Sequence, residues 1–217
     1  MRLYSIPANI KGLIFDIDQT LYRHDFYYDL QENLQIREYA ACENISYESA
    51  CEKIKEFRES AGSDGKRPSL GNTFKHFGYP IELTVKWREK LFHPEDYISR
   101  DEQLRALFRI LHAKYKIIAV TNNADRIGWK TLEALGIAEY FIEVLGLDKT
   151  GVSKPHKGPF IKALEVIANK AEETVAIGDR YHIDIEIPLD MGMGGILVES
   201  MEDVYKIYRV LEDNQKS

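Results

Sequence analysis

Four short apolar runs, each followed at once by polar residues, constrain most strongly how this chain folds. They are residues 12–15, 116–120, 174–177 and 195–198. A near-continuous apolar run of this length is typical of a parallel strand that is covered on both faces. Residues 140–144 form a weaker fifth candidate. The runs therefore predict the strands of one buried sheet.

Amphipathic patterns lie between these runs. Apolar side chains recur at helical spacing in residues 104–111, 160–167 and 204–211, and a further helical pattern stops at Gly136, a residue type common just after a helix. Strands that alternate with helices indicate βαβ units. We therefore predict an α/β fold with a doubly wound parallel sheet.

The alternation of strands and helices is interrupted between Tyr22 and about Tyr97, an interval that contains no convincing buried strand. Its pattern indicates helices, with loops near Gly62–Gly71 and Gly78–Pro80. A structureless connection of such length is uncommon inside a compact domain. We therefore predict an α/β core domain, residues 1–21 and 98–217, and an inserted helical cap domain, residues 22–97.

The predicted insert is rich in aromatic residues, for which two interpretations are open. Aromatic side chains fill the core of a small helical bundle efficiently because each buries a large apolar area. Alternatively, some of them, such as Phe26, Tyr27 and Tyr28, line a substrate pocket.

Composition excludes several classes of protein. The chain has 217 residues, of which 44% are hydrophobic, so it can fill a core, unlike disordered or collagen-like chains. A formal net charge of −6 argues against non-specific nucleic-acid binding, and a phosphate would need local cations or a metal.

The two cysteines, Cys42 and Cys51, are expected to be free thiols. No targeting or membrane segment is evident, so we expect a cytoplasmic protein without a membrane partner.

A pair of carboxylates follows the first apolar run. Alternation along an extended segment places Asp16 and Asp18 on the same side of the chain. Two neighbouring carboxylates repel each other and need a cation or a proton to coexist, and hard oxygen ligands suit Mg²⁺. Taken alone, the pair is also compatible with a solvated turn at the end of a strand.

Polar residues also follow the second run and precede the helix at 160–167. Thr121 and Asn122 offer a hydroxyl and backbone N–H groups that can bind an anion, although a Thr-Asn pair here is also a common helix cap. Lys154 can bring an ammonium group to the same region, and Lys157 competes for this role.

Two further carboxylates, Asp179 and Asp184, come after the third run. Taken singly, they could be unrelated surface acids. Ligands bind at the carboxyl edge of an open parallel sheet. We therefore expect these acids to converge there with the residues that follow the other strands.

In this order the residues resemble the four motifs of the haloacid dehalogenase (HAD) superfamily of hydrolases. The pattern is DxDxT at 16–20, threonine at 121, lysine at 154 and GDxxxxD at 178–184. The resemblance covers nearly the whole chain, and the insert after the first motif is similar to the family's helical C1 cap. The string at 15–22 is similar to that of pyrimidine 5′-nucleotidase-like members.

The resemblance implies a role for each catalytic residue. Asp16 would be the nucleophile that forms an aspartyl-phosphate. Asp18 would protonate the leaving alcohol and then deprotonate the hydrolytic water. Thr121 and the Asn122 backbone N–H would hold phosphoryl oxygens, and Lys154 would neutralise charge on the nucleophile and the phosphate.

The resemblance also implies a Mg²⁺ cofactor. Asp16, Asp179 and the backbone carbonyl of Asp18 would bind the ion, and Asp184 would either ligate it through water or brace Lys154. A metal and a lysine screen the repulsion between an anionic nucleophile and an anionic phosphate.

The implied function is that of a Mg²⁺-dependent phosphatase acting on a small phosphorylated metabolite, such as a nucleotide or a sugar phosphate, as a monomer or homodimer. An acid at Asp18 favours phosphoryl transfer over dehalogenation, because a halide leaving group needs no proton. Two alternatives remain: a phosphomutase acting on a phosphorylated sugar, and a non-catalytic protein that binds a phosphorylated ligand or a protein partner.

Overall fold

A computed structural model describes residues 1–61 and 68–215 of the chain. The chain divides into two compact units, which we call the core unit and the helical unit. The core unit comprises Met1–His24 and His93–Ser217, and the helical unit comprises Asp25–Phe92. No helix in the described part of the chain is long and apolar enough to span a membrane.

The core unit is built on a six-stranded sheet with the strand order β1-β6-β5-β2-β3-β4. The β1–β6 pair is antiparallel, and every other neighbouring pair is parallel. This arrangement confirms the predicted α/β class. The strands are β1 (Arg2–Tyr4), β2 (Gly12–Phe15), β3 (Lys116–Val120), β4 (Val144–Leu145), β5 (Thr174–Gly178) and β6 (Gly194–Leu197).

Two features of the sheet differ from the prediction. The strand β1 adds an antiparallel edge, so the sheet is mixed rather than wholly parallel. The segment 140–144 is not a five-residue strand, because the 3₁₀ turn η2 (Ala138–Tyr140) occupies its start and β4 begins only at its last residue. The ring of Phe141 lies against Phe15 and Phe108, while residues 142 and 143 form single backbone hydrogen bonds with β3, from Ile142 N to Ile117 O and from Ala119 N to Glu143 O.

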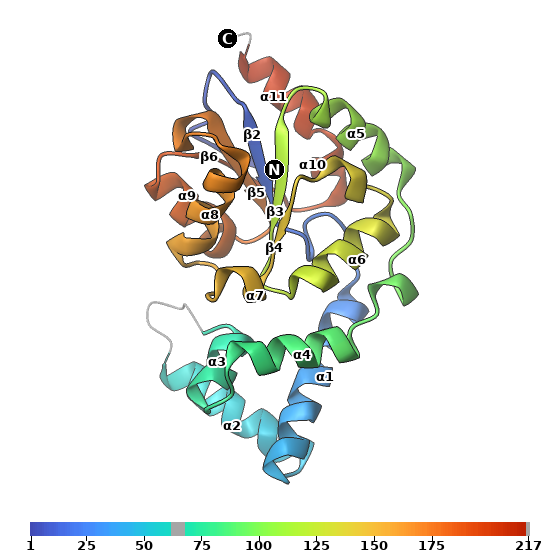
Figure 1. Ribbon diagram of the computed structural model, residues 1–217, viewed down its shortest axis with the longest axis vertical. Coiled ribbons are helices and arrows are strands. Elements are labelled where there is room, and N and C mark those ends of the chain that lie inside the picture. The colour runs from blue at the N-terminus through green and yellow to red at the C-terminus, as the bar shows by residue number, and fades with distance from the viewer. Residues whose placement is uncertain (62–67, 216–217) are drawn as a thin grey trace. The chain divides into compact units, whose positions relative to one another are not determined.

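Helices cover both faces of this sheet, with α8 and α9 on one side and α5 and α6 on the other (Figure 1). The helices of the core unit are α5 (Glu102–His112), α6 (Asp125–Leu135), α7 (Leu147–Thr150), α8 (Lys157–Ile167), α9 (Glu186–Asp190), α10 (Met201–Tyr205) and α11 (Ile207–Gln215). Shorter helical turns are η1 (Pro94–Asp96), η3 (Ala171–Glu173) and η4 (Tyr181–Ile185).

Neighbouring residues of β2 pack against the two layers of helices on opposite faces of the sheet. Successive side chains of a strand point to opposite faces, so neighbouring residues serve different layers. Ile14 belongs to the buried cluster that contains Phe160 of α8. Phe15 packs against Phe108 of α5, with ring centroids 5.0 Å apart. Burial on both faces explains why this strand reads as a continuous apolar run.

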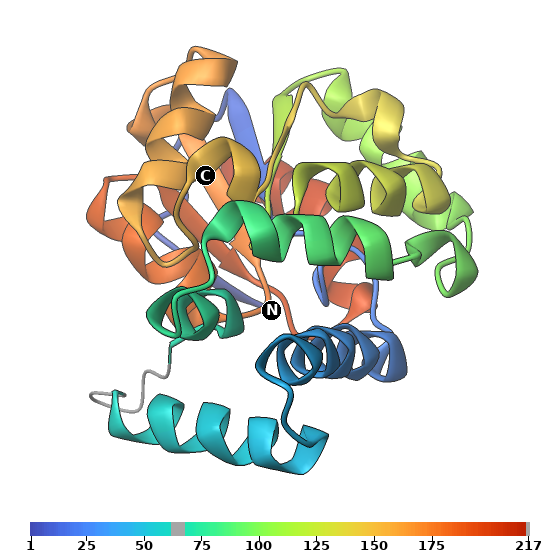
Figure 2. The same cartoon turned by 60° about the horizontal axis from the view of Figure 1, so that its bottom comes forward.

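The helical unit contains α1 (Asp25–Glu43), α2 (Tyr47–Ser60), α3 (Leu70–His76) and α4 (Ile81–Leu91), coloured from blue to green in Figure 2. Its buried core includes Tyr39, Phe74 and Trp87. The ring centroids of Tyr39 and Phe74 lie 5.4 Å apart, and those of Phe74 and Trp87 lie 5.6 Å apart. These aromatic residues therefore fill the interior of the bundle.

Three expectations about the helical unit stay predictions. They are its role as a cap, the limits 22–97 and the lining of a substrate pocket by Phe26 and its neighbours. The loop predicted near Gly62–Gly71 falls largely on residues 62–67, which lie outside the described residues.

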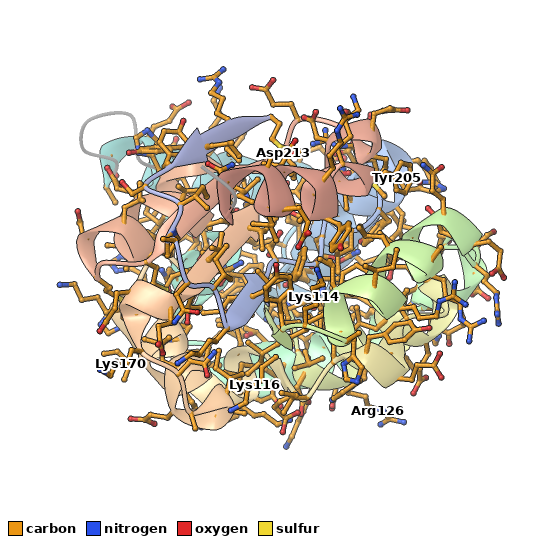
Figure 3. The ribbon with its side chains drawn as sticks, turned by 90° about the horizontal axis from the view of Figure 1, so that it is seen from above. Lys114, Lys116, Arg126, Lys170, Tyr205 and Asp213 are labelled. Atoms are coloured by element: carbon orange, nitrogen blue, oxygen red, sulfur yellow. The ribbon has the colours of Figure 1, made fainter. Side chains whose placement is uncertain are left out.

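The central strands bring their carboxyl ends together. β2 pairs in parallel with both β3 and β5, so the residues that follow these three strands are neighbours. Those residues are Asp16, Thr121 and Asp179. Figure 3 views the molecule from the opposite end of the strands, where Lys116 begins β3.

Candidate active site

Asp16, the first residue after β2, is held through both of its carboxylate oxygens. Oδ1 accepts a hydrogen bond from Lys154 Nζ at 2.6 Å, and Oδ2 accepts one from Thr20 Oγ1 at 2.9 Å. The residue is only 3% exposed. Its backbone N–H donates to Ile177 O at 2.9 Å, which ties the end of β2 to β5. These contacts fix the direction of the carboxylate.

Lys154 lies between two carboxylates in the interior of the core unit. Its Nζ is 2.6 Å from Asp16 Oδ1 and 2.7 Å from Asp184 Oδ1, and the residue is 2% exposed. Burial opposes the charge, but the two carboxylates outweigh it and raise the pKa of Lys154. The side chain is therefore an ammonium group. The competing Lys157 is exposed at the start of α8.

Each carboxyl oxygen of Asp18 accepts a hydrogen bond from a hydroxyl group. Tyr22 donates to Oδ1 at 2.7 Å, and Thr121 donates to Oδ2 at 3.3 Å. Burial, followed by the negative charge of Asp16, raises the pKa of Asp18 above its ordinary value. A raised pKa favours the protonated form that a general acid requires.

Thr121 and Asn122 connect the end of β3 to the rest of this region. Thr121 Oγ1 accepts a hydrogen bond from the Asn123 backbone N–H at 3.0 Å while it donates to Asp18. The side chain of Asn122 bonds to the backbone of Lys154. The two residues therefore lie beside the predicted acid and the predicted lysine.

Asp184 reaches the cluster because the chain at Gly178 leaves room for it. A Cβ atom on Gly178 would lie 2.3 Å from Asp184 Cβ, so no larger residue fits there without displacement. Asp184 Oδ2 accepts a hydrogen bond from the Arg180 backbone N–H at 3.1 Å. Its Oδ1 faces Lys154, so the carboxylate is held on both sides.

Three carboxylates lie close enough to share one cation. Asp16, Asp179 and Asp184 each offer an oxygen, and these oxygens lie within 4.8 Å of one another. Burial, then the charges of Asp16 and Asp184, raise the pKa of Asp179 to about 7. Such a set of hard oxygen donors suits Mg²⁺. The carboxylate of Asp18 faces Tyr22 and Thr121 instead, which leaves its backbone carbonyl as the expected ligand.

Thr20 and Tyr22 are site residues to which the sequence assigned no role. Each lies four positions after the carboxylate that it contacts, Asp16 and Asp18 respectively. The chain makes a tight turn at Gln19, whose φ of 62° lies in the left-handed region, and the isolated bridge between Asp18 and Tyr22 across this turn is parallel. The four-residue spacing within each pair is visible in the sequence, but the turn is what converts the spacing into a contact.

Arg180 adds a second cation, which was also not anticipated. Its Nε lies 3.6 Å from Asp179 Oδ1, and its side chain is 42% exposed. The two histidines next to the motifs do not join the cluster. His156 caps α8 by accepting from Gly158 N, and the exposed His182 lies near Glu186.

Comparison with known proteins places this geometry in a family. Residues 10–192 match the family described as haloacid dehalogenase-like hydrolase. A glyceraldehyde 3-phosphate phosphatase from Methanocaldococcus jannaschii is 26% identical over 220 residues, which cover 96% of this chain and 91% of that protein. The pyrophosphatase PpaX from Listeria welshimeri is 32% identical over 123 residues, which cover 55% of this chain and 56% of that protein.

Solved structures agree on the fold. The crystal structure of a HAD phosphatase from Thermococcus onnurineus gives a TM-score of 0.62 at 20% identity, covering 93% of this chain and 98% of that chain. The family match extends from before β2 to the end of α9 and includes all the strands that carry the site. The resemblance inferred from the four motifs is thereby confirmed, and the chain belongs to the haloacid dehalogenase-like hydrolase family.

Proposed function

We propose that this hydrolase is a Mg²⁺-dependent phosphatase that cleaves a small phosphate monoester through an aspartyl-phosphate on Asp16. One observation carries the proposal: an acid, Asp18, lies beside Asp16 and forms a hydrogen bond with Thr121, the predicted phosphate ligand. Protonation of the leaving group is needed for an alcohol and not for a halide. This pairing of acid and phosphate ligand supports phosphoryl transfer.

The residues present fit a divalent cation. Asp16, Asp179 and Asp184 supply three oxygen donors that lie close together, and burial, followed by the charges of the other two carboxylates, raises the pKa of Asp179. Asp16, Asp179 and the Asp18 carbonyl would hold Mg²⁺, while Asp184 would stay on Lys154 or act through water. When bound, the ion supplies positive charge that offsets repulsion between the nucleophile and the phosphate oxygens.

In the first step, Asp16 attacks the phosphorus atom. Lys154 and the Thr121 hydroxyl hold phosphoryl oxygens, together with the backbone N–H of Asn122. A bond forms between an Asp16 oxygen and phosphorus while the bond to the leaving oxygen breaks. Asp18 gives its proton to that oxygen, so the product leaves as a neutral alcohol and Asp18 becomes a carboxylate.

In the second step, a water molecule hydrolyses the aspartyl-phosphate. Asp18 takes a proton from the water, whose oxygen attacks phosphorus. The bond between phosphorus and Asp16 breaks, which releases inorganic phosphate and restores the Asp16 carboxylate. Asp18 is then protonated again, as the first step requires.

The names of the relatives support a small substrate. The Methanocaldococcus relative is named for a three-carbon sugar phosphate, and the Listeria relative for pyrophosphate. Both are compact anions, which the cations Lys154 and Arg180 can attract despite the acidity of the chain as a whole. We propose a small phosphorylated metabolite as the substrate, with sugar phosphates and nucleotides as the classes to screen.

The proposal is tested by phosphate release from p-nitrophenyl phosphate and from a panel of sugar phosphates, phosphoglycolate and nucleotides, with Mg²⁺ present. We expect turnover that EDTA abolishes. Asp16→Asn should leave almost no activity, because an amide oxygen is a poor nucleophile. The matched control is Asp190→Asn, at an exposed position at the end of α9, which should retain full activity.

Three results would contradict the proposal. Full activity of Asp16→Asn would exclude the nucleophile. Binding without turnover across the panel would indicate a non-catalytic protein. Transfer of phosphate between positions of a sugar, without release of inorganic phosphate, would indicate a phosphomutase.

A further inference from the structure

The loop that follows β2 makes a tight turn and places an aromatic hydroxyl on the predicted acid. Leu21 N donates to Ile17 O at 2.9 Å, and the backbones of Asp18 and Tyr22 form an isolated bridge. Gln19 supplies the positive φ at the turn. The loop therefore brings the phenol of Tyr22 to the carboxyl group of Asp18, four residues earlier in the chain.

The two hydroxyls on Asp18 differ in what else they do. The Thr121 hydroxyl lies 3.3 Å from Oδ2, and the same group is the proposed ligand of a phosphoryl oxygen. Tyr22 lies 2.7 Å from Oδ1, and its side chain is 5% exposed. When a phosphate takes the hydrogen bond of Thr121, the bond from Tyr22 still restrains Asp18.

We propose that Tyr22 is a positioning residue: its hydroxyl holds Oδ1 of Asp18 so that Oδ2, on the side of Thr121, carries the proton to the leaving oxygen. This inference rests on the proposed phosphatase function. Tyr22 touches neither the phosphate nor the leaving group and acts through Asp18. A positioned general acid is effective only when its proton lies within hydrogen-bond reach of the acceptor atom.

The role of Tyr22 predicts a dependence on the leaving group. An alkoxide leaves only with a proton, whereas p-nitrophenolate is stable as an anion and leaves nearly as well without one. Loss of the Tyr22 hydroxyl should therefore slow the cleavage of alkyl phosphates selectively. A general disturbance of the site would slow both kinds of substrate alike.

The test compares Tyr22→Phe with the wild type on p-nitrophenyl phosphate and on the fastest alkyl phosphate of the substrate screen. We expect kcat for the alkyl phosphate to fall roughly ten- to a hundredfold, a part of the ~10²- to 10⁴-fold that a general acid contributes. For p-nitrophenyl phosphate we expect a loss of less than about threefold. Both rates come from one preparation, so their ratio does not depend on how much of the variant is folded.

The matched control is Tyr205→Phe, which also removes a tyrosine hydroxyl that donates to an aspartate. Tyr205 is the last residue of α10 and is labelled in Figure 3. Its hydroxyl donates to Asp101 Oδ2 at 2.6 Å. Its removal should leave the ratio of the two rates unchanged. In an Asp18→Asn background, Tyr22→Phe should cause no further selective loss, because Tyr22 acts through Asp18.

The outcomes separate the two proposals. Equal losses on both substrates, or no loss on either, would overturn the role of Tyr22 while the phosphatase function stands. A further selective loss in the Asp18→Asn background would also overturn it. A wild-type protein that hydrolyses neither substrate would overturn the phosphatase function and the role of Tyr22 together.

Discussion

The side-chain amide of Asn122 pairs with the backbone of Lys154 through two hydrogen bonds. Asn122 Oδ1 accepts from Lys154 N at 2.7 Å, and Asn122 Nδ2 donates to Lys154 O at 3.1 Å. The amide thus links the end of β3 to a loop 32 residues later in the chain. Because the ammonium group of Lys154 contacts Asp16, this pairing also sets the position of the lysine relative to the nucleophile.

Asn122→Ala should therefore impair both stability and catalysis. Two hydrogen bonds at about 1 kcal/mol each predict a loss of about 2 kcal/mol in the free energy of unfolding, measured in urea. We expect kcat/KM to fall by roughly tenfold or more, since small displacements of catalytic groups are costly. The control, Asn214→Ala, removes one exposed hydrogen bond to Val210 O and should cost less than about 0.5 kcal/mol. Unchanged kcat/KM in Asn122→Ala would contradict the link.

Lys154→Met should make the stability of the protein strongly dependent on metal. The variant leaves Asp16 and Asp184 buried without their cation, and loss of one partner from a buried pair costs about 3–5 kcal/mol. We expect Mg²⁺ to raise the melting temperature of the variant more than that of the wild type, and EDTA to reverse the gain. Lys170→Met, at a lysine whose side chain is 75% exposed, should behave as the wild type. Equal responses to Mg²⁺ would contradict this prediction.

The strands that carry the site could be predicted from the sequence because a strand that is buried on both faces has a continuous run of apolar residues. β2, β3 and β5 are such strands. The edge strand β1 could not be found in this way, since its residues are exposed or half-buried and its pairing with β6 joins distant parts of the chain. In the run at 140–144, only Val144 belongs to a strand, and Phe141 is apolar because its ring packs against other rings.

In the site, too, some residues could be predicted from the sequence and others could not. Residues that directly follow a strand could be placed at one sheet edge from topology alone, and the structure brings Asp16, Thr121 and Asp179 together there. The contacts of Thr20 and Tyr22 could not be predicted, because they depend on the tight turn of the chain at Gln19. The positioning role of Tyr22, like the catalytic roles of the strand-end residues, stays a prediction until variants are measured.

Gly178→Ala should disturb the site through Asp184. The new Cβ would lie 2.3 Å from Asp184 Cβ and 2.5 Å from its Cγ, so the carboxylate has to move away from Lys154. Overpacking of this kind costs about 1–3 kcal/mol in the free energy of unfolding, and we expect kcat/KM to fall with it. The control, Gly78→Ala, places a Cβ at a φ of 91°, where no atom of the described residues lies within 4 Å apart from those of Gly78 and its two chain neighbours. It should cost about 1–2 kcal/mol through backbone strain alone and leave kcat/KM unchanged.

Tyr205→Phe should lower the free energy of unfolding at neutral pH, and this effect should disappear at high pH. Tyr205 donates to Asp101 Oδ2 at 2.6 Å, and Asp101 Oδ1 caps α5 by accepting from Leu104 N at 2.8 Å. Burial, followed by this hydrogen bond to Asp101, raises the pKa of Tyr205 to about 12. Because the folded pKa lies above the ordinary value of about 10, the contribution to stability is complete below pH ~10 and is lost as the pH rises towards ~12.

We therefore expect Tyr205→Phe to lower the free energy of unfolding by about 1 kcal/mol at neutral pH, measured in urea. The difference from the wild type should shrink as the pH rises above ~10, because the unfolded tyrosine then ionises while the folded one still resists. In an Asp101→Asn background, the cap on Leu104 can remain while the negative charge facing Tyr205 is gone. The effect of Tyr205→Phe on the free energy of unfolding should therefore depend less on pH in that background. A difference between Tyr205→Phe and the wild type that stays constant across this range would show that Tyr205 does not donate to an ionised Asp101.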